Sequence, residues 1–520
     1  MNALTYFLLS FFLISLILSY LSMISTKNSF ETVRDMDMGY NLGNTFDNYE
    51  YFYDEINTPE EQITLKANTL PTKNMIKKLK KYGFKTIRFP VTWLYFIDEY
   101  GNINSNWMFL VKKVVDFIIK EDLYCILNVY HDGDSGNWLS FGIEIKDKYI
   151  NLWTEIANEF KDYNNYLIFE SMDEAHFYNP ITYNFDYDVL LNLNQAFIDT
   201  IRNSGGNNIK RLLIVAGALD ILEMTISSDY KIPTDPSNKL AVSIHYYEPT
   251  PFTKEKYFEP FNWTDEEGFP QVFEPTLSWG NQDEYLKIIT DFELMRFNFV
   301  KKGIPIIISE VGVRTEEKKK LESIREYLYT IFSLSSDYDG IMSCLWDTSN
   351  KEYGDMNFYD RENDIWYDEK LKDNFNQISK GKYAKPKDFY SKTHLNIMYN
   401  PYFDKIMQLN LGDRKALNIF INATLTGSLF IDLDFNVSSY DAFGKIFKIK
   451  FGKSNAKKQY DGTTIFTIDV SKIECHEYIL VEISFGRKYI ILNSLSVEFV
   501  ESFQYLDYKL YKNAISNYIN

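Results

Sequence analysis

Cysteine is scarce in this chain of 520 residues, and the three that occur, Cys125, Cys344 and Cys475, lie far apart in the sequence. So few cysteines cannot form the disulfide framework that holds many small secreted domains together. No Cys/His cluster has the spacing of a zinc site, and the chain has no glycine-rich loop of the phosphate-binding type. We therefore expect no metal and no cofactor to take part in its function.

Basic residues are also outnumbered, with 55 Lys and Arg against 72 Asp and Glu, which gives a formal net charge of −17. Affinity for nucleic acids and for anionic membranes comes mainly from Lys and Arg, so neither is an expected partner. The G-x-S-x-G nucleophile elbow is missing as well, which argues against a serine hydrolase of the α/β type.

Aromatic residues are abundant at 17%, with 40 Tyr and 40 Phe. Aromatic rings stack against the faces of pyranose sugars, so this composition fits a glycan-binding protein. A biased genome composition explains the same excess equally well.

Residues 4–24 form an uncharged apolar run about as long as a membrane span. Residues 1–26 are predicted to be a secretory signal peptide, and the protein is expected to be secreted and monomeric. The run has no preceding Lys or Arg and no A-x-A site after it, so an uncleaved membrane anchor is the alternative. Sequons at Asn262, Asn422 and Asn436 agree weakly with the secretory route.

Between residues 30 and 385, short apolar runs alternate with longer amphipathic stretches. The runs are apolar almost throughout, as in strands that are covered on both faces. The pattern predicts a (β/α)₈ TIM barrel, although a doubly wound sheet has the same alternation. Predicted strands lie at 38–44, 84–91, 123–132, 166–174, 211–217, 240–249, 304–312 and 340–347, and predicted helices at 71–83, 105–121, 188–206, 282–302 and 315–334.

Polar residues gather at the C-terminal ends of these strands. The stretch IFESMDEAHF (168–177) is typical, because a core strand runs directly into carboxylates. A barrel brings such ends together at one rim, where barrel enzymes have their active sites. The strand-end residues are Asn44, Arg88, His131, Asp173 with Glu174, His245, Glu310 and Trp346.

Two strand-end glutamates, Glu174 and Glu310, point to the cleavage of glycosidic bonds. In that chemistry one carboxylic acid protonates the leaving oxygen, and the other attacks the anomeric carbon or activates water. Glu170, on the strand itself, is interpreted as a structural partner of a barrel cation, and His176 as a rim residue without a role.

The motifs NLGNTFDN, KTIRFPVTW, NVYHDG, LIFESMDEA, VSIHYYEP with a later SWG, IPIIISEVG and LWD resemble, in order and spacing, those of family-5 glycoside hydrolases. These are retaining, cellulase-type barrel enzymes that cut β-linked glucans, and the resemblance covers about residues 36–380. It implies that Glu174 is the acid/base and Glu310 the nucleophile. It further implies substrate-site roles for Asn44, Arg88, Tyr130, His131, Asp173, His245, Tyr247 and Trp346.

The chain departs from the family pattern at two positions of this site. Asp173 stands where the family usually has Asn, and Tyr130 stands where it usually has His. Two functions are therefore considered. One is a working endo-β-1,4-glucanase that cleaves cellulose, mixed-linkage glucan or xyloglucan; the other is an impaired barrel that binds glycan without hydrolysing it.

From about residue 390 the pattern changes to short strands rich in β-branched and aromatic residues. Residues 390–502 are predicted to form an antiparallel β-sandwich, either a carbohydrate-binding module or a spacer, followed by a polar tail at 503–520. The acidic and aromatic stretch 251–279 is interpreted as a long rim loop, with a disordered insert as the alternative.

Overall fold

The structure is a computed structural model in which two compact units are distinguished, residues 1–280 with 294–386, and 281–293 with 387–520. We describe each unit by itself. The predicted leader at 1–26, most of the rim loop and the tail at 503–520 lie outside the described residues. The structure describes residues 27–49, 58–66, 68–179, 182, 184–254, 276–315, 319–349 and 356–385, together with strands at 263–264 and 270–271 and strands between 405 and 500.

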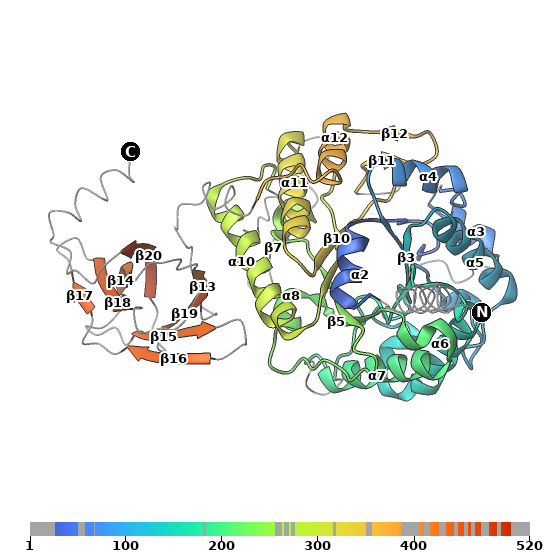
Figure 1. The fold of residues 1–520 in the computed structure, drawn as a ribbon, viewed down its shortest axis with the longest axis horizontal. Helices are drawn as coiled ribbons and strands as arrows, with labels where there is room; N and C mark the ends of the chain where they lie inside the picture. The colour runs from blue at the N-terminus through green and yellow to red at the C-terminus, as the bar shows by residue number, and fades with distance from the viewer. Residues whose placement is uncertain are drawn as a thin grey trace, which may run out of the picture. The chain divides into compact units, whose positions relative to one another are not determined.

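Eight parallel strands close into a barrel in the first unit (Figure 1), in the spatial order β1-β10-β9-β6-β5-β4-β3-β2. Closure occurs where β1 pairs with both β2 and β10, and it confirms the predicted TIM barrel over a doubly wound sheet. The barrel strands are β1 (Met38–Asn41), β2 (Thr86–Phe89), β3 (Tyr124–Leu127), β4 (Leu167–Glu170), β5 (Leu213–Ile221), β6 (Leu240–His245), β9 (Ile306–Val311) and β10 (Ile341–Leu345).

Nearly every residue of these strands is buried, which explains why their sequences are apolar rather than alternating. Most strands stop before the polar end of the predicted segment. The first, for example, ends at Asn41, and Asn44 lies in the loop that follows. The polar side chains thus belong largely to the rim, just beyond the last ladder pairs.

Helices of the first unit cover the outside of the barrel, and the helices predicted from the sequence are present with shifted ends; α10 is divided between the two units. The helix α6 was not predicted, although its buried residues recur at helical spacing, as in Leu152, Trp153, Ile156 and Phe160. The helices are α2 (Ser29–Met36), α3 (Pro59–Thr64), α4 (Lys73–Lys81), α5 (Ser105–Lys120), α6 (Lys146–Phe160), α7 (Tyr187–Asn203), α8 (Leu222–Thr225), α9 (Thr250–Thr253), α10 (Gln282–Asn298), α11 (Leu321–Asp337) and α12 (Glu369–Ile378).

The short helix α2 precedes the first strand and closes the N-terminal end of the barrel. A capping box between Asn28 and Glu31 starts it. Its Val33 and Met36 join a buried cluster with residues from six strands, including Ile126 of β3. The barrel floor is therefore sealed by apolar packing, which leaves the opposite rim for polar chemistry.

The second unit contains two four-stranded antiparallel sheets, ordered β13-β19-β15-β16 and β17-β18-β14-β20. Six of these strands were predicted, whereas β13 and the short β17 were not. That the sheets form a sandwich stays a prediction. The strands are β13 (Lys405–Leu409), β14 (Ala416–Leu425), β15 (Leu433–Tyr440), β16 (Ile446–Phe451), β17 (Ala456–Lys458), β18 (Thr463–Asp469), β19 (Tyr478–Phe485) and β20 (Ile490–Val500).

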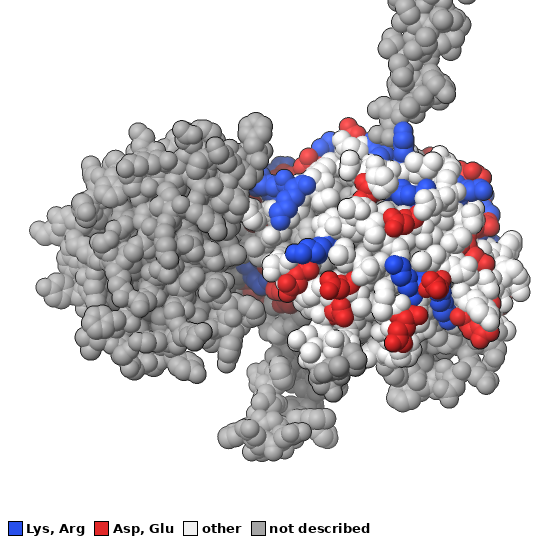
Figure 2. All heavy atoms as spheres, turned by 90° about the horizontal axis from the view of Figure 1, so that it is seen from below, with Lys and Arg blue, Asp and Glu red and all other residues white. Residues whose placement is uncertain are grey.

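Charged side chains of both signs are interspersed on the face of the barrel that Figure 2 shows. Arg34 and Asp339 form one exposed ion pair of the barrel unit, with Nη2 and Oδ1 2.8 Å apart. Among the described helices, we find none with the length and apolar character needed to cross a membrane.

Candidate active site

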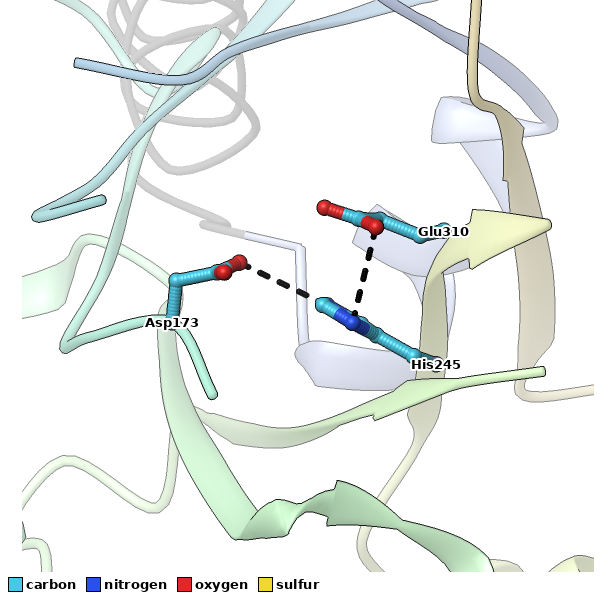
Figure 3. A group of neighbouring side chains, drawn as sticks. All are labelled: Asp173, His245 and Glu310. Atoms are coloured by element: carbon cyan, nitrogen blue, oxygen red, sulfur yellow. Dashed lines mark ion pairs between the residues drawn. The ribbon is translucent and has the colours of Figure 1, made fainter. Parts of the chain in front are cut away.

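The rim at the C-terminal ends of the strands carries a connected group of ionisable side chains. Figure 3 shows three of them converging: Asp173 from the loop after β4, His245 from β6 and Glu310 from β9. The strand-end residues predicted to meet at the rim therefore include a set that is in direct contact.

Arg88 of β2 is the centre of this group. The side chain is fully buried, and its guanidinium donates to Glu170 Oε2 at 2.7 Å, to Glu310 Oε1 at 2.8 Å and to Asp173 Oδ1. The Nη1 atom that donates to Glu310 also donates to Asn41 Oδ1 at 3.1 Å. A buried guanidinium is tolerated only when its donors are satisfied, and charge-assisted bonds of this kind fix geometry strongly. Arg88 thus sets the positions of three carboxyl groups, with Glu170 as the structural partner expected.

Glu310 receives two further hydrogen bonds from phenols. Tyr247 Oη donates to Oε2 at 2.9 Å, and Tyr130 Oη donates to Oε1 at 2.9 Å. Burial raises the pKa of both phenols well above the usual value, so both remain donors at neutral pH. The Tyr130 ring also stacks on Trp346, with centroids 5.7 Å apart and an interplanar angle of 7°. The residue that departs from the family pattern is thus bonded to the candidate nucleophile.

Glu174 has a different environment. Its side chain is 38% exposed, and its Oε1 lies 2.7 Å from His245 Nδ1. Burial opposes the ionised form, but the hydrogen bond and charge of His245 lower the pKa of Glu174 to about 2. Burial likewise opposes a charged imidazole, yet Glu310 and Asp173 raise the pKa of His245 well above its usual value. In the unliganded site the proton of this pair therefore belongs to His245.

The two glutamates are close to one another. His245 Nδ1 is 2.7 Å from Glu174 Oε1 and 3.5 Å from Glu310 Oε2, so these oxygens lie within about 6 Å of each other. Carboxyl pairs that hold a water molecule for inversion are about 6.5–9.5 Å apart, and pairs that form a covalent intermediate are about 5–5.5 Å apart. The upper limit for this one pair of oxygens lies below the range for inversion.

Asp220 is a buried residue of this site that the sequence analysis missed. Its Oδ2 accepts the backbone N–H of Glu174 at 3.0 Å, and Oδ1 accepts that of Gly217 at 3.0 Å. Burial raises the pKa of Asp220 to about 8. Its φ of 52°, like the 50° of Leu219, is left-handed. Of the eight predicted strands, only 211–217 had no polar residue assigned to its C-terminal end. That missing residue could have directed attention to Asp220.

Three other predicted residues lie outside the group around Arg88. His131 Nδ1 bonds to Asp134 at 2.8 Å, and its ring lies 5.5 Å from that of Tyr49. Asn44 has a left-handed φ of 56°, and its backbone N–H donates to Asp47. Trp346 is partly exposed beside Tyr130. Among the described residues, these three have contacts at the rim other than hydrogen bonds to the two glutamates.

His176 is held by the rim itself, because its Nδ1 accepts the backbone N–H of Ser135 at 3.1 Å. This contact joins the loop after β4 to the loop after β3. His176 thus takes part in a contact between loops, and it is not a hydrogen-bond partner of either glutamate in the described residues.

Residues 52–352 match the sequence model of the family Cellulase (glycosyl hydrolase family 5). Endoglucanase A of Clostridium longisporum is 32% identical over 367 residues, which are 67% of this chain and 65% of that protein. Endoglucanase A of Paenibacillus barcinonensis is 35% identical over 299 residues, 54% of this chain and 71% of that protein. The alignment thus spans about two thirds of the first relative and somewhat more of the second.

Solved structures give the same picture. A GH5-4 broad specificity endoglucanase from an uncultured bovine rumen ciliate is 53% identical, with a TM-score of 0.66, over 68% of this chain and 99% of that one. A lichenase from Caldicellulosiruptor sp. F32, a mutant in complex with cellotetraose, is 28% identical with a TM-score of 0.60, over 69% of this chain and 96% of that one.

Proposed function

The chain belongs to the cellulase family, glycosyl hydrolase family 5, and on that premise we propose that it is a retaining endo-β-1,4-glucanase. Its substrate would be a β-linked plant or cell-wall polysaccharide such as cellulose, mixed-linkage glucan or xyloglucan. The endoglucanases and the lichenase among its relatives support a glucan over other sugars.

The observation that carries this proposal is the contrast between two neighbouring carboxyl groups. Glu310 is bonded to Arg88, Tyr130 and Tyr247, which hold its carboxyl group in a fixed orientation, as a nucleophile requires. Glu174 is bonded to a protonated imidazole and reaches solvent. Pairs of carboxyls with such different environments are how glycosidases divide the two roles.

In the proposed mechanism, a bound sugar excludes water from the Glu174–His245 pair. The proton can then move from His245 Nδ1 to Glu174 Oε1 along their 2.7 Å contact. This transfer neutralises both side chains as water leaves the site. Glu174 gives that proton to the leaving oxygen while Glu310 attacks the anomeric carbon. Water, activated by Glu174 as a base, then releases the sugar with its configuration retained.

The alternative function, glycan binding without hydrolysis, gains no support from the two departures from the family pattern. Tyr130 donates to Glu310, and Asp173 accepts from Arg88. Both replacements therefore have bonded partners in the site. We further propose secretion, on the basis of the apolar run at residues 4–24.

The test is release of reducing sugar from barley β-glucan, xyloglucan, carboxymethyl cellulose, xylan and mannan between about pH 4 and 8. Glu310→Gln is the background control, because it removes the attacking carboxylate and keeps the side-chain shape. NMR of the first product should show the β-anomer. An α-anomer would contradict retention, and no release above the control on any polymer would contradict the whole proposal.

A further inference from the structure

The active site contains more acid than base. In the ion pairs among the described residues, five carboxyl groups share two basic side chains, and these two bases cannot neutralise all five. In a buried cleft, such an excess is relieved when one or more carboxyls keep a proton. The acids are Glu170, Asp173, Glu174, Asp220 and Glu310, and the bases are Arg88 and His245.

Asp173 presents its two oxygens to different surroundings. Oδ1 accepts from Arg88 Nη2 and lies 3.4 Å from His245 Nε2. Oδ2 has no hydrogen-bond partner among the described residues. It is absent from the atoms that are both fully buried and without a partner, so part of its surface is exposed. The side chain is 4% exposed, so Oδ2 is the atom that Asp173 offers to the cleft.

We propose that Asp173 acts as a neutral carboxylic acid, whose Oδ2–H donates a hydrogen bond to a hydroxyl group of the sugar bound between Glu174 and Glu310. This inference rests on the proposed function and adds a residue that contacts the substrate and determines how it is held. The proton stays on Asp173 throughout and is not transferred in the reaction. Hydrogen bonds to the sugar next to the cleaved bond strengthen in the transition state, so the donor would contribute to the rate.

The surroundings explain why the proton would remain on Oδ2. Arg88 is shared among three carboxyl groups, so Asp173 receives only part of its charge. Burial and the charge of Glu310 oppose ionisation, whereas Arg88 and His245 favour it, and burial outweighs them so that the pKa of Asp173 is raised to about 6. A sugar that covers Oδ2 removes its remaining water and raises this pKa further. The titratable groups around Asp173 are Arg88, Tyr130, His131, Glu170, Asp220, His245, Tyr247 and Glu310.

Asp173→Asn is the decisive variant, because an amide can accept from Arg88 with its oxygen and donate to the cleft with its nitrogen at every pH. We expect kcat/KM near pH 5 to be retained, and its decline at high pH to move upward by about one pH unit or more. The direction is diagnostic. If the decline belonged to Glu174 alone, removal of a nearby negative charge would lower the pKa of Glu174 and move the decline downward.

Glu170→Gln is the matched control. It removes a negative charge from the same guanidinium and the same strand, but it changes nothing on the cleft side of Asp173. We expect its decline at high pH to stay in place or to move downward. An upward move in both variants would mean that the shift does not require an amide at position 173, and it would overturn the proposal.

A loss of more than about tenfold in Asp173→Asn at all pH values would also overturn it, since that result requires an ionised acceptor. A wild type without activity contradicts the proposed function but leaves this inference testable by ¹³C NMR of labelled aspartate carboxyls. Asp173→Asn identifies the resonance, and a thio-linked cellotetraose occupies the cleft without being cut. A protonated Asp173 at pH 6 supports the proposal, and an ionised one contradicts it.

Discussion

The two glutamates of the site, Glu174 and Glu310, are neighbours that differ in burial and in hydrogen-bond partners. Among the described residues, Glu310 is buried and receives three donors, whereas Glu174 is 38% exposed and its side chain has one hydrogen-bond partner, His245. A nucleophile benefits from fixed orientation and constant charge. An acid/base must gain and lose a proton twice in each cycle, and a single titratable partner permits that. On the proposed assignment, we attribute the difference in role to the number and type of hydrogen-bond donors around each carboxyl group.

The strongest test of this contrast uses two substrates. Glu310→Ala should lower kcat on barley β-glucan and on dinitrophenyl β-cellobioside, on the order of 10⁴-fold or more, because the attacking group is gone. Glu174→Ala should lower activity on β-glucan about 10²- to 10⁴-fold. On the dinitrophenyl substrate its first step should be nearly unaffected, because that leaving group needs no proton. Burst kinetics would show this, and equal losses on both substrates would contradict the assignment of Glu174.

A smaller effect is expected when the donors to Glu310 are removed one at a time. Tyr247→Phe and Tyr130→Phe delete bonds to opposite oxygens of the same carboxylate. A hydrogen bond to a charged group contributes about 1.5–3 kcal/mol, so each variant should lose about 10- to 100-fold in kcat/KM. Tyr40→Phe is the control, since it deletes a buried phenol bond to Asp347 elsewhere in the barrel. A loss in the control as large as in the other two would mean that the phenols act through stability.

The smallest effect concerns stability rather than rate. Burial raises the pKa of Asp220 to about 8 from the ordinary value of 3.8, so the folded chain holds a proton that the unfolded chain releases. The free energy of unfolding should therefore fall as pH rises from about 4 to about 8. Asp220→Asn should flatten the dependence of Tm on pH over that range, and the exposed Asp199→Asn should leave it unchanged. An equally steep dependence in Asp220→Asn would show that Asp220 is ionised.

Much of this site could be anticipated from the sequence because its residues follow apolar strands directly. Arg88, Glu310 and His245 lie on strands whose apolar pattern predicts the barrel, and a barrel brings strand ends together whatever the loops do. Glu174 lies only four residues beyond its strand. For these residues, position along the chain nearly determines position in the fold.

Other features depend on distances and dihedral angles that sequence patterns do not encode. Asp220 enters the site through a left-handed pair of residues after an apparently apolar strand end. The bond from Tyr130 to Glu310 requires a phenol to span a gap whose width follows from the packing of β3 against its neighbours. From the sequence alone, Tyr130 was a departure from the family pattern. In the structure it is a donor to the candidate nucleophile.

The contacts of Arg88 also have a consequence for the order of folding. Its partners lie on β1, β4 and β9. Two of them, Asn41 and Glu310, are 269 positions apart along the chain, and Arg88 bonds to both. A nascent chain that lacks Glu310 would leave part of this guanidinium without its carboxylates, and a buried charge without its partners is strongly unfavourable. The first half of the barrel should therefore stay hydrated at its centre until β9 packs against it. Recovery of glucanase activity during refolding would then report a late docking event of the barrel, the arrival of β9, rather than an early one.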